Sequence, residues 1–216
     1  MSQQLYADLA AAVIEGEEDL VVSLVKQGLD RGIRPLDMIQ HGLSRGMNVV
    51  GERFSCGEFF LPHLVMAGSA MKAALTILEP ALRAGGVVRP TAGVVVLGTV
   101  AGDIHEIGKS LVGTMLVAEG FVVHDLGVDV PAERFVGAVR DTGANLVGLS
   151  ALLTTTMRNQ RHVIEALTEA GLRQQVKLMV GGAPVSRQWA QEIGADGYAE
   201  DAVGAAALAR RLVAHL

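Results

Sequence analysis

The sequence predicts an α/β protein in which an N-terminal four-helix bundle precedes a five-stranded parallel sheet domain. Up to about residue 85, apolar residues recur at helical spacing with no β-like alternation. Beyond that point, short apolar runs alternate with helical patterns, which is typical of repeated βα units. The expected domains are residues 1–88 and 89–216, joined through a segment rich in glycine and containing Pro90.

The first domain is expected to contain four amphipathic helices. Each carries one apolar stripe, and the short loops between them favour an antiparallel bundle. The helical patterns cover residues 5–16, 19–32, 34–54 and 61–82. Pro35 and Pro62 lie near the starts of the last two, where a missing N–H is tolerated.

The second domain is expected to contain five strands, each followed by a helix. The strand patterns cover residues 93–99, 121–126, 145–150, 176–182 and 196–199. The helical patterns cover residues 107–120, 131–143, 154–171, 185–194 and 202–216. The nearly unbroken apolar strands indicate a parallel sheet of the flavodoxin- or Rossmann-like type, with helices on both faces. His124, inside the second strand, is therefore expected to be packed.

Composition excludes several classes of protein. The chain has 216 residues, half of them hydrophobic, a net charge of −5 and no basic cluster, so nucleic acid is not an expected partner. A single cysteine, Cys56, excludes an internal disulfide and fits a reducing compartment. No signal-peptide pattern and no unbroken apolar run of about 18 residues is present, so we expect a cytoplasmic protein with no membrane partner.

The segment GTVAGDIHEIGKSLV (98–112) follows the first strand, where a parallel sheet places its ligand site. Its Gly108-Lys109-Ser110 resembles the end of a phosphate-binding loop, but Asp103 stands where that motif needs its first glycine. A carboxylate there repels phosphate, so Lys109 is expected to be a solvated residue of the first helical turn.

A metal site fits this segment better. His105 follows Asp103 by two residues, as a ligating imidazole and its orienting carboxylate do. A lone histidine holds a bare divalent ion poorly, because no further ligand lies at zinc-like spacing. It suffices as the axial ligand of a metal already held by a macrocycle, with haem and a corrin-bound cobalt as the two candidates.

Three elements then resemble the cobalamin-binding signature. Residues 103–108 match D-x-H-x-x-G, and Ser150-Ala151-Leu152 supplies S-x-L after 41 intervening residues. A further 28 residues lead to the glycine pair 181–182. The helical half, with GERFSCGEFFLPHLVMAGSAMKAALTILEP, is similar to the helical cap of corrinoid proteins that serve methyltransferases. The resemblance covers nearly the whole chain and includes the two central modules of cobalamin-dependent methionine synthase.

The resemblance implies a set of cofactor contacts. His105 would be the lower axial ligand of cobalt, with Asp103 and Thr156 forming a proton network behind it; Thr156 stands where the family has serine. The nucleotide tail of the corrinoid would enter a slot in the sheet domain. The residues expected to contact cobalamin or a related cobamide are Asp103, His105, Glu106, Ile107, Gly108, Ser150, Leu152, Thr154, Thr156, Gly181 and Gly182.

The resemblance also implies a function in one-carbon metabolism. The chain would be a non-catalytic carrier that cycles between cob(I)alamin and methylcobalamin. It would accept a methyl group from a substrate-specific methyltransferase and pass it to a second methyltransferase serving tetrahydrofolate or coenzyme M. Because Co(I) is easily oxidised, a reductive activator is a further expected partner.

Three alternatives stay open at this point. They are the small subunit of an adenosylcobalamin-dependent mutase, a cobalamin-based sensor and a flavodoxin-like haem binder. In the helical half, Phe59, Phe60, Leu61 and Met66 are candidates to cover the methyl-bearing face, although packing inside the bundle is the more common role for such residues. Residues 85–90 are the expected hinge for moving the cap.

Overall fold

The computed structural model describes residues 2–85 and 91–214. The chain divides into two compact units, with the boundary between residues 90 and 91. The expected hinge falls mainly on residues 86–90, outside the described residues. We call residues 2–85 the cap unit and residues 91–214 the sheet unit, and each is described by itself.

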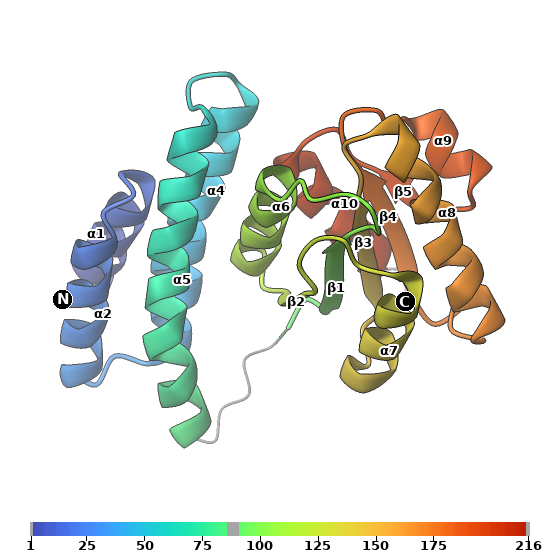
Figure 1. The fold of residues 1–216 in the computed structure, drawn as a ribbon. Coiled ribbons are helices and arrows are strands. Elements are labelled where there is room, and N and C mark those ends of the chain that lie inside the picture. Colours follow the sequence, from blue (N-terminus) through green and yellow to red (C-terminus); the bar gives the residue numbers. More distant parts are fainter. Residues whose placement is uncertain (1, 86–90, 215–216) are drawn as a thin grey trace. The chain divides into compact units, whose positions relative to one another are not determined.

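The cap unit is built from helices, as expected (Figure 1). They are α1 (Ser2–Ile14), α2 (Glu18–Asp30), α3 (Pro35–Met38), η1 (Ile39–Leu43), α4 (Ser44–Ser55) and α5 (Leu61–Ala84). The third expected helix is thus divided, because a π-helical turn, η1, separates α3 from α4. The pattern of apolar residues does not reveal this turn, since it shifts the helical register without interrupting it.

Helix α5 is long and apolar enough, by length and composition, to cross a membrane. It is also the central helix of the cap unit, and it packs against α1, α2, α3 and α4. Its buried stripe includes Leu64, Met71, Leu75, Leu78 and Leu82. The same composition therefore serves here to fill the interior of a bundle.

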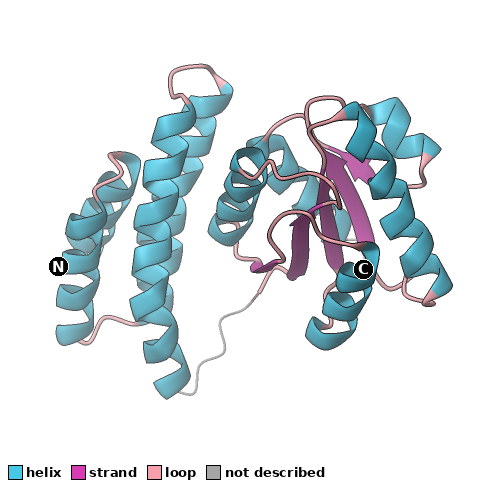
Figure 2. Ribbon diagram, viewed as in Figure 1, coloured by secondary structure: helices cyan, strands magenta, loops and turns pink. Residues whose placement is uncertain are grey.

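The sheet unit has five parallel strands in the order β2-β1-β3-β4-β5. The strands are β1 (Val94–Thr99), β2 (Val122–Asp125), β3 (Leu146–Ser150), β4 (Lys177–Gly181) and β5 (Gly197–Tyr198). The helices are α6 (Ile107–Ala118), α7 (Ala132–Thr142), α8 (Thr154–Glu169), α9 (Arg187–Glu192) and α10 (Ala202–Val213). Helices lie on both sides of the sheet (Figure 2). The flavodoxin-like order confirms the expected fold class.

The core of the sheet unit lies on both faces of the central strands. One cluster joins β1, β3 and β4 to α7, α8 and α9, and includes Val96, Phe135 and Leu167. The other lies toward α6 and α10 and includes Leu116 and Leu208. This two-sided burial explains why the central strands are almost continuously apolar.

The prediction that His124 is packed is wrong. His124 lies in β2, and its side chain is exposed. The reason is that β2 is the edge strand, with β1 as its one neighbour in the sheet. Val122, two residues earlier, is also exposed, so the apolar character of this strand does not reflect burial.

Candidate corrinoid-binding site

The loop between β1 and α6 carries Asp103 and His105 beyond the carboxyl end of the first strand. Asp103 is completely buried, whereas the His105 side chain is 44% exposed. Nδ1 of His105 lies 2.7 Å from Oδ1 of Asp103. An ionised carboxylate only accepts hydrogen bonds, so Nδ1 carries the proton and Nε2 keeps its lone pair. The half-exposed imidazole therefore keeps one nitrogen, Nε2, with a lone pair suited to ligate a metal.

The surroundings of Asp103 keep its carboxylate ionised. Burial raises the pKa of Asp103, but hydrogen bonds to the carboxylate outweigh that effect and hold the pKa well below its usual range. Thr156 Oγ1 donates to Oδ2 at 2.6 Å, and the His105 ring donates to Oδ1. The Leu152 N–H donates to Oδ2 at 2.8 Å, and the His105 N–H to Oδ1 at 3.1 Å. Two loops thus converge on one carboxylate.

Three strands bring other expected residues to the same edge of the sheet. In the strand register, Thr99 is paired with Ser150, and Ser150 is paired with Gly181. Leu152 follows β3 and is exposed. Thr154, the first residue of α8, is exposed and lies outside the hydrogen-bond network seen around Asp103 among the described residues. The structure therefore assembles the three motif segments at one place but leaves Thr154 apart from the network.

Packing within the protein requires glycine at one position of the cobalamin-binding motif but not at another. Gly182 has a φ of +125°, and a Cβ there would lie 1.8 Å from the Ala151 carbonyl oxygen. Glycine at this position is thus needed for the turn after β4 to pack on the end of β3. A Cβ on Gly108, by contrast, would meet no protein atom within 4 Å. The protein's own packing does not require Gly108, and the space beside it is open to a ligand.

Exposed apolar side chains flank His105 on the two loops that hold Asp103. Ile104 is 74% exposed, and Ile107, Leu152 and Leu153 are exposed as well. Neither Ile104 nor Leu153 is singled out by the sequence pattern. Their signal is an apolar residue within a loop, which without an alignment does not distinguish a packed residue from a contact surface.

These features fit a corrinoid better than a bare ion. Within residues 2–85 and 91–214, no group of three His, Cys, Asp or Glu side chains is placed to hold a metal. One exposed imidazole nitrogen amid apolar side chains suits a metal whose other positions are filled by a flat macrocycle. The open space at Gly108 supports the same fit.

The expectation that Lys109 is solvated is wrong. Its side chain is 0% exposed, and Nζ contacts both carboxylate oxygens of Asp125 at the end of β2. Glu106, at the start of α6, lies 3.8 Å from the same ammonium. Lys109 does lie in the first helical turn, as expected, but its ion pair with Asp125 joins that turn to the end of β2 and buries the lysine side chain. This ion pair also leaves no free ammonium for a phosphate.

In the cap unit, packing inside the bundle is the wrong interpretation for three of the four candidate covering residues. Phe60, Leu61 and Met66 are exposed, Phe60 by 64%. Phe59 is half-buried and stacks on His63 with a centroid distance of 4.4 Å. These residues lie around the start of α5, next to the loop that follows α4. They form an exposed apolar surface on the cap unit.

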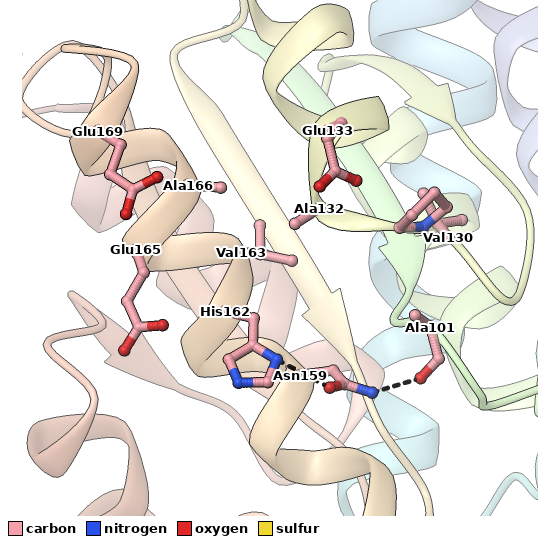
Figure 3. Close-up of a pocket in the computed structure, with 11 residues that line it drawn as sticks. Ala101, Val130, Ala132, Glu133, Asn159, His162, Val163, Glu165, Ala166 and Glu169 are labelled. Carbon is pink, nitrogen blue, oxygen red and sulfur yellow. Dashed lines mark hydrogen bonds between the residues drawn. The ribbon is translucent and has the colours of Figure 1, made fainter.

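A separate pocket of about 430 Å³ lies between α7 and α8 (Figure 3). Its lining combines apolar residues with Glu133, Glu165 and Glu169. Asn159 lies at its inner end, where Nδ2 donates a 2.6 Å hydrogen bond to the Ala101 carbonyl. The pocket therefore adjoins the start of the histidine loop.

Comparison with known proteins defines the class. Residues 93–207 match a family model described as a B12 binding domain, and residues 5–79 match a second model with that description. The chain belongs to the B12-binding family of corrinoid proteins, and its cofactor is a corrinoid.

Individual relatives cover nearly the whole chain. Dimethylamine corrinoid protein 2 of Methanosarcina mazei is 47% identical over 211 residues, 98% of this chain and 98% of that protein. A corrinoid protein of Desulfitobacterium hafniense is 46% identical and covers 99% of each chain. A chain in the crystal structure of the methanol:cobalamin methyltransferase complex MtaBC from Methanosarcina barkeri matches with a TM-score of 0.88 and 34% identity. That match covers 99% of this chain and 81% of the other.

Proposed function

We propose that the protein is a methyl-carrier subunit that moves a methyl group between two methyltransferases. The observation that carries the proposal is the half-exposed imidazole of His105, held by a buried, ionised Asp103 in a chain of the corrinoid family. The names of the relatives, which include dimethylamine and methanol systems, favour a methyl carrier over a mutase subunit or a sensor. Similarity to these relatives extends through the helical cap, which the mutase alternative does not explain.

In this proposal Nε2 of His105 would hold the cobalt of the bound corrinoid. The bound corrinoid supplies a metal centre that accepts and releases a methyl group. Asp103 orients the imidazole and fixes its tautomer, and Thr156 keeps the carboxylate hydrogen-bonded on its other oxygen.

The remaining motif residues would hold the rest of the cofactor. Ser150 and Leu152 would line the slot for the nucleotide tail, together with Gly181 and Gly182. Gly108 would leave room for the corrinoid beside the first turn of α6, where Glu106 and Ile107 are also exposed. The helical cap (1–88) and the corrinoid-binding domain (89–216) would act as separate domains, and Phe60, Leu61 and Met66 give the cap an exposed apolar surface.

The proposed partners follow from the same cycle. A substrate-specific methyltransferase supplies the methyl group, with dimethylamine and methanol as the first donors to test. A second methyltransferase passes it to tetrahydrofolate or coenzyme M, and a reductive activator returns oxidised cobalt to the reactive state. All are expected in the cytoplasm.

Methyl accounting tests this proposal. The full chain is loaded with hydroxocobalamin, reduced, and incubated with a ¹⁴C-labelled donor and the methyltransferase encoded beside its gene. We expect up to one labelled methyl group per corrinoid on the carrier, and its release to tetrahydrofolate or coenzyme M only after the second methyltransferase is added. A carrier that stays unlabelled with every neighbouring methyltransferase, but supports an adenosyl-dependent rearrangement, would refute it.

A further inference from the structure

The loop that carries His105 is hydrogen-bonded, at the turn where it leaves β1, to a residue of another loop. Asp129, in the segment after β2, accepts a 2.6 Å hydrogen bond from the Gly102 N–H through Oδ1. The Asp129 N–H in turn donates to the Asp103 carbonyl at 2.9 Å. One residue thus grips the backbone on both sides of the peptide bond that leads into Asp103.

A second side chain holds the same turn from α8. Asn159 Nδ2 donates to the Ala101 carbonyl at 2.6 Å, and its Oδ1 lies 3.1 Å from Nδ1 of His162 (Figure 3). Ala101 and Gly102 are therefore each bonded to a side chain from a different part of the sheet unit. These contacts span 58 and 27 residues of sequence, respectively.

The conformation of Asp129 shows that this grip carries a conformational cost. Its φ is +53°, and it is the one non-glycine residue with positive φ within the part of the chain that the structure describes. Residues are held in this region only where their surroundings determine the conformation, although Asp and Asn tolerate it better than most. Here the two hydrogen bonds to the histidine loop hold Asp129 at its positive φ.

We propose that Asp129 and Asn159 are positioning residues that clamp the Ala101–Gly102 turn and thereby hold His105 in its ligating orientation. The inference rests on the proposed role of His105 as the lower ligand. The Gly102 backbone has a φ of +78° and no side chain of its own to restrain it. Without these hydrogen bonds, the backbone of the turn would sample more conformations. Because Asp103 follows Gly102 directly, its carboxylate and the imidazole bonded to it would then be less fixed in orientation.

Substitutions at Asp129 separate the hydrogen bond from the backbone conformation. Asp129→Asn keeps an acceptor oxygen and tolerates positive φ, whereas Asp129→Gly accepts positive φ without strain but lacks the acceptor. Asn159→Leu removes the other hydrogen bond while keeping the same number and branching of side-chain heavy atoms. Glu165→Leu is its matched control, because Glu165 lines the same pocket and forms no hydrogen bond or ion pair with the loop within the described part of the chain.

The readout is the fraction of cobalt ligated by a protein histidine. The full chain is labelled with ¹⁵N-histidine, loaded with hydroxocobalamin and reduced to Co(II). A ¹⁵N ligand splits the electron paramagnetic resonance signal into doublets, whereas the cofactor's own ¹⁴N base gives triplets. The ratio of histidine-ligated cobalt, which gives doublets, to all other cobalt reports ligation in the loaded, folded protein. The thermal melt of each apo variant is measured separately.

We expect the ratio of histidine-ligated to unligated cobalt to fall about fivefold in Asp129→Gly and in Asn159→Leu, which corresponds to one net hydrogen bond each. In the double variant it should fall roughly 25-fold if the two act independently. Asp129→Asn and Glu165→Leu should stay within about twofold of the wild type.

The controls separate two kinds of failure. If His105→Gln keeps the ¹⁵N doublet, the ligand assignment itself is wrong. If His105→Gln loses the doublet but Asp129→Gly and Asn159→Leu keep the wild-type ratio, the clamp is refuted and the proposed function stands. A loss in Asp129→Asn as large as that in Asp129→Gly also refutes the clamp, because the acceptor would then be irrelevant.

Discussion

The two halves of the Lys109–Asp125 ion pair are predicted to be unequally costly to remove. The Lys109 side chain is 0% exposed, and that of Asp125 is 38% exposed. In Lys109→Met, an apolar chain fills the buried space and the carboxylate left behind still reaches water. In Asp125→Asn, the ammonium stays buried, and its remaining carboxylate neighbour is Glu106 at 3.8 Å.

The magnitude follows from which charge is stranded. An uncompensated buried charge costs about 3–5 kcal/mol, so we expect Asp125→Asn to lower the free energy of unfolding by about 3 kcal/mol, given the partial compensation by Glu106. Lys109→Met mainly loses hydrogen bonds to a carboxylate that is resolvated, and we expect a loss of about 1 kcal/mol.

Urea unfolding followed by tryptophan fluorescence measures both values. The sequence has one tryptophan, Trp189, which lies in α9 of the sheet unit and so reports on the unit that holds the ion pair. Both transitions should keep the wild-type slope with denaturant concentration. A loss for Lys109→Met equal to or larger than that for Asp125→Asn would refute the reasoning.

Four further predictions use the same unfolding assay, a binding titration or the electron paramagnetic resonance measurement of histidine ligation. Because the pKa of Asp103 is lowered on folding, its ionised form stabilises the apo protein above the unfolded-state pKa of about 3.9, and this contribution declines as the pH falls below it. The stability advantage over Asp103→Asn should therefore shrink by at least ~1 kcal/mol between pH 6 and pH 3; an advantage that grows toward low pH would contradict the assignment. Gly182→Ala, which drives a Cβ into the Ala151 carbonyl, should cost more than about 3 kcal/mol, and a cost below ~1 kcal/mol would show that the turn adapts freely. Gly108→Ala should leave apo stability unchanged or raise it by up to about 1 kcal/mol but weaken hydroxocobalamin binding, and unchanged binding would place the cofactor elsewhere. Thr156→Val should reduce the ¹⁵N-histidine ligation ratio, Thr156→Ser should restore it, and equal effects of the two would exclude a role for the hydroxyl.

The regular part of the fold follows from local sequence pattern. Helical periodicity predicts the cap helices, and the continuous apolar strands predict a two-sided parallel sheet. The ligand end of that sheet is also predictable, because the carboxyl ends of parallel strands share one edge. The π-helical turn η1 is not predictable in this way, since it changes the register of a helix without removing its apolar stripe.

The residues whose burial or exposure was wrongly predicted share a physical cause. The burial of Lys109 depends on the approach of α6 to the end of β2, and the partner Asp125 lies 16 residues further along. The exposure of His124 depends on the strand order, which places β2 at an edge. Phe60 and Met66 are apolar but exposed around the start of α5. In each case the local sequence is compatible with either environment, and tertiary neighbours decide.

The site shows the same division. The D-x-H-x-x-G, S-x-L and Gly-Gly segments are recognisable by spacing, and the structure brings them to one edge of the sheet. The side chains that clamp the loop, Asp129 and Asn159, carry no motif of their own. Their proposed role depends on contacts between segments that are distant in the sequence. Such contacts cannot be predicted from a single sequence.

The central claim is that Nε2 of His105 is the lower ligand of the corrinoid cobalt. Its most direct test is the electron paramagnetic resonance spectrum of the wild-type chain, labelled with ¹⁵N-histidine and loaded with unlabelled cobalamin in the Co(II) state. The structure predicts ¹⁵N doublets that are absent from His105→Gln. Triplets from the cofactor's own base in the wild-type spectrum, or doublets that survive the substitution, would contradict it.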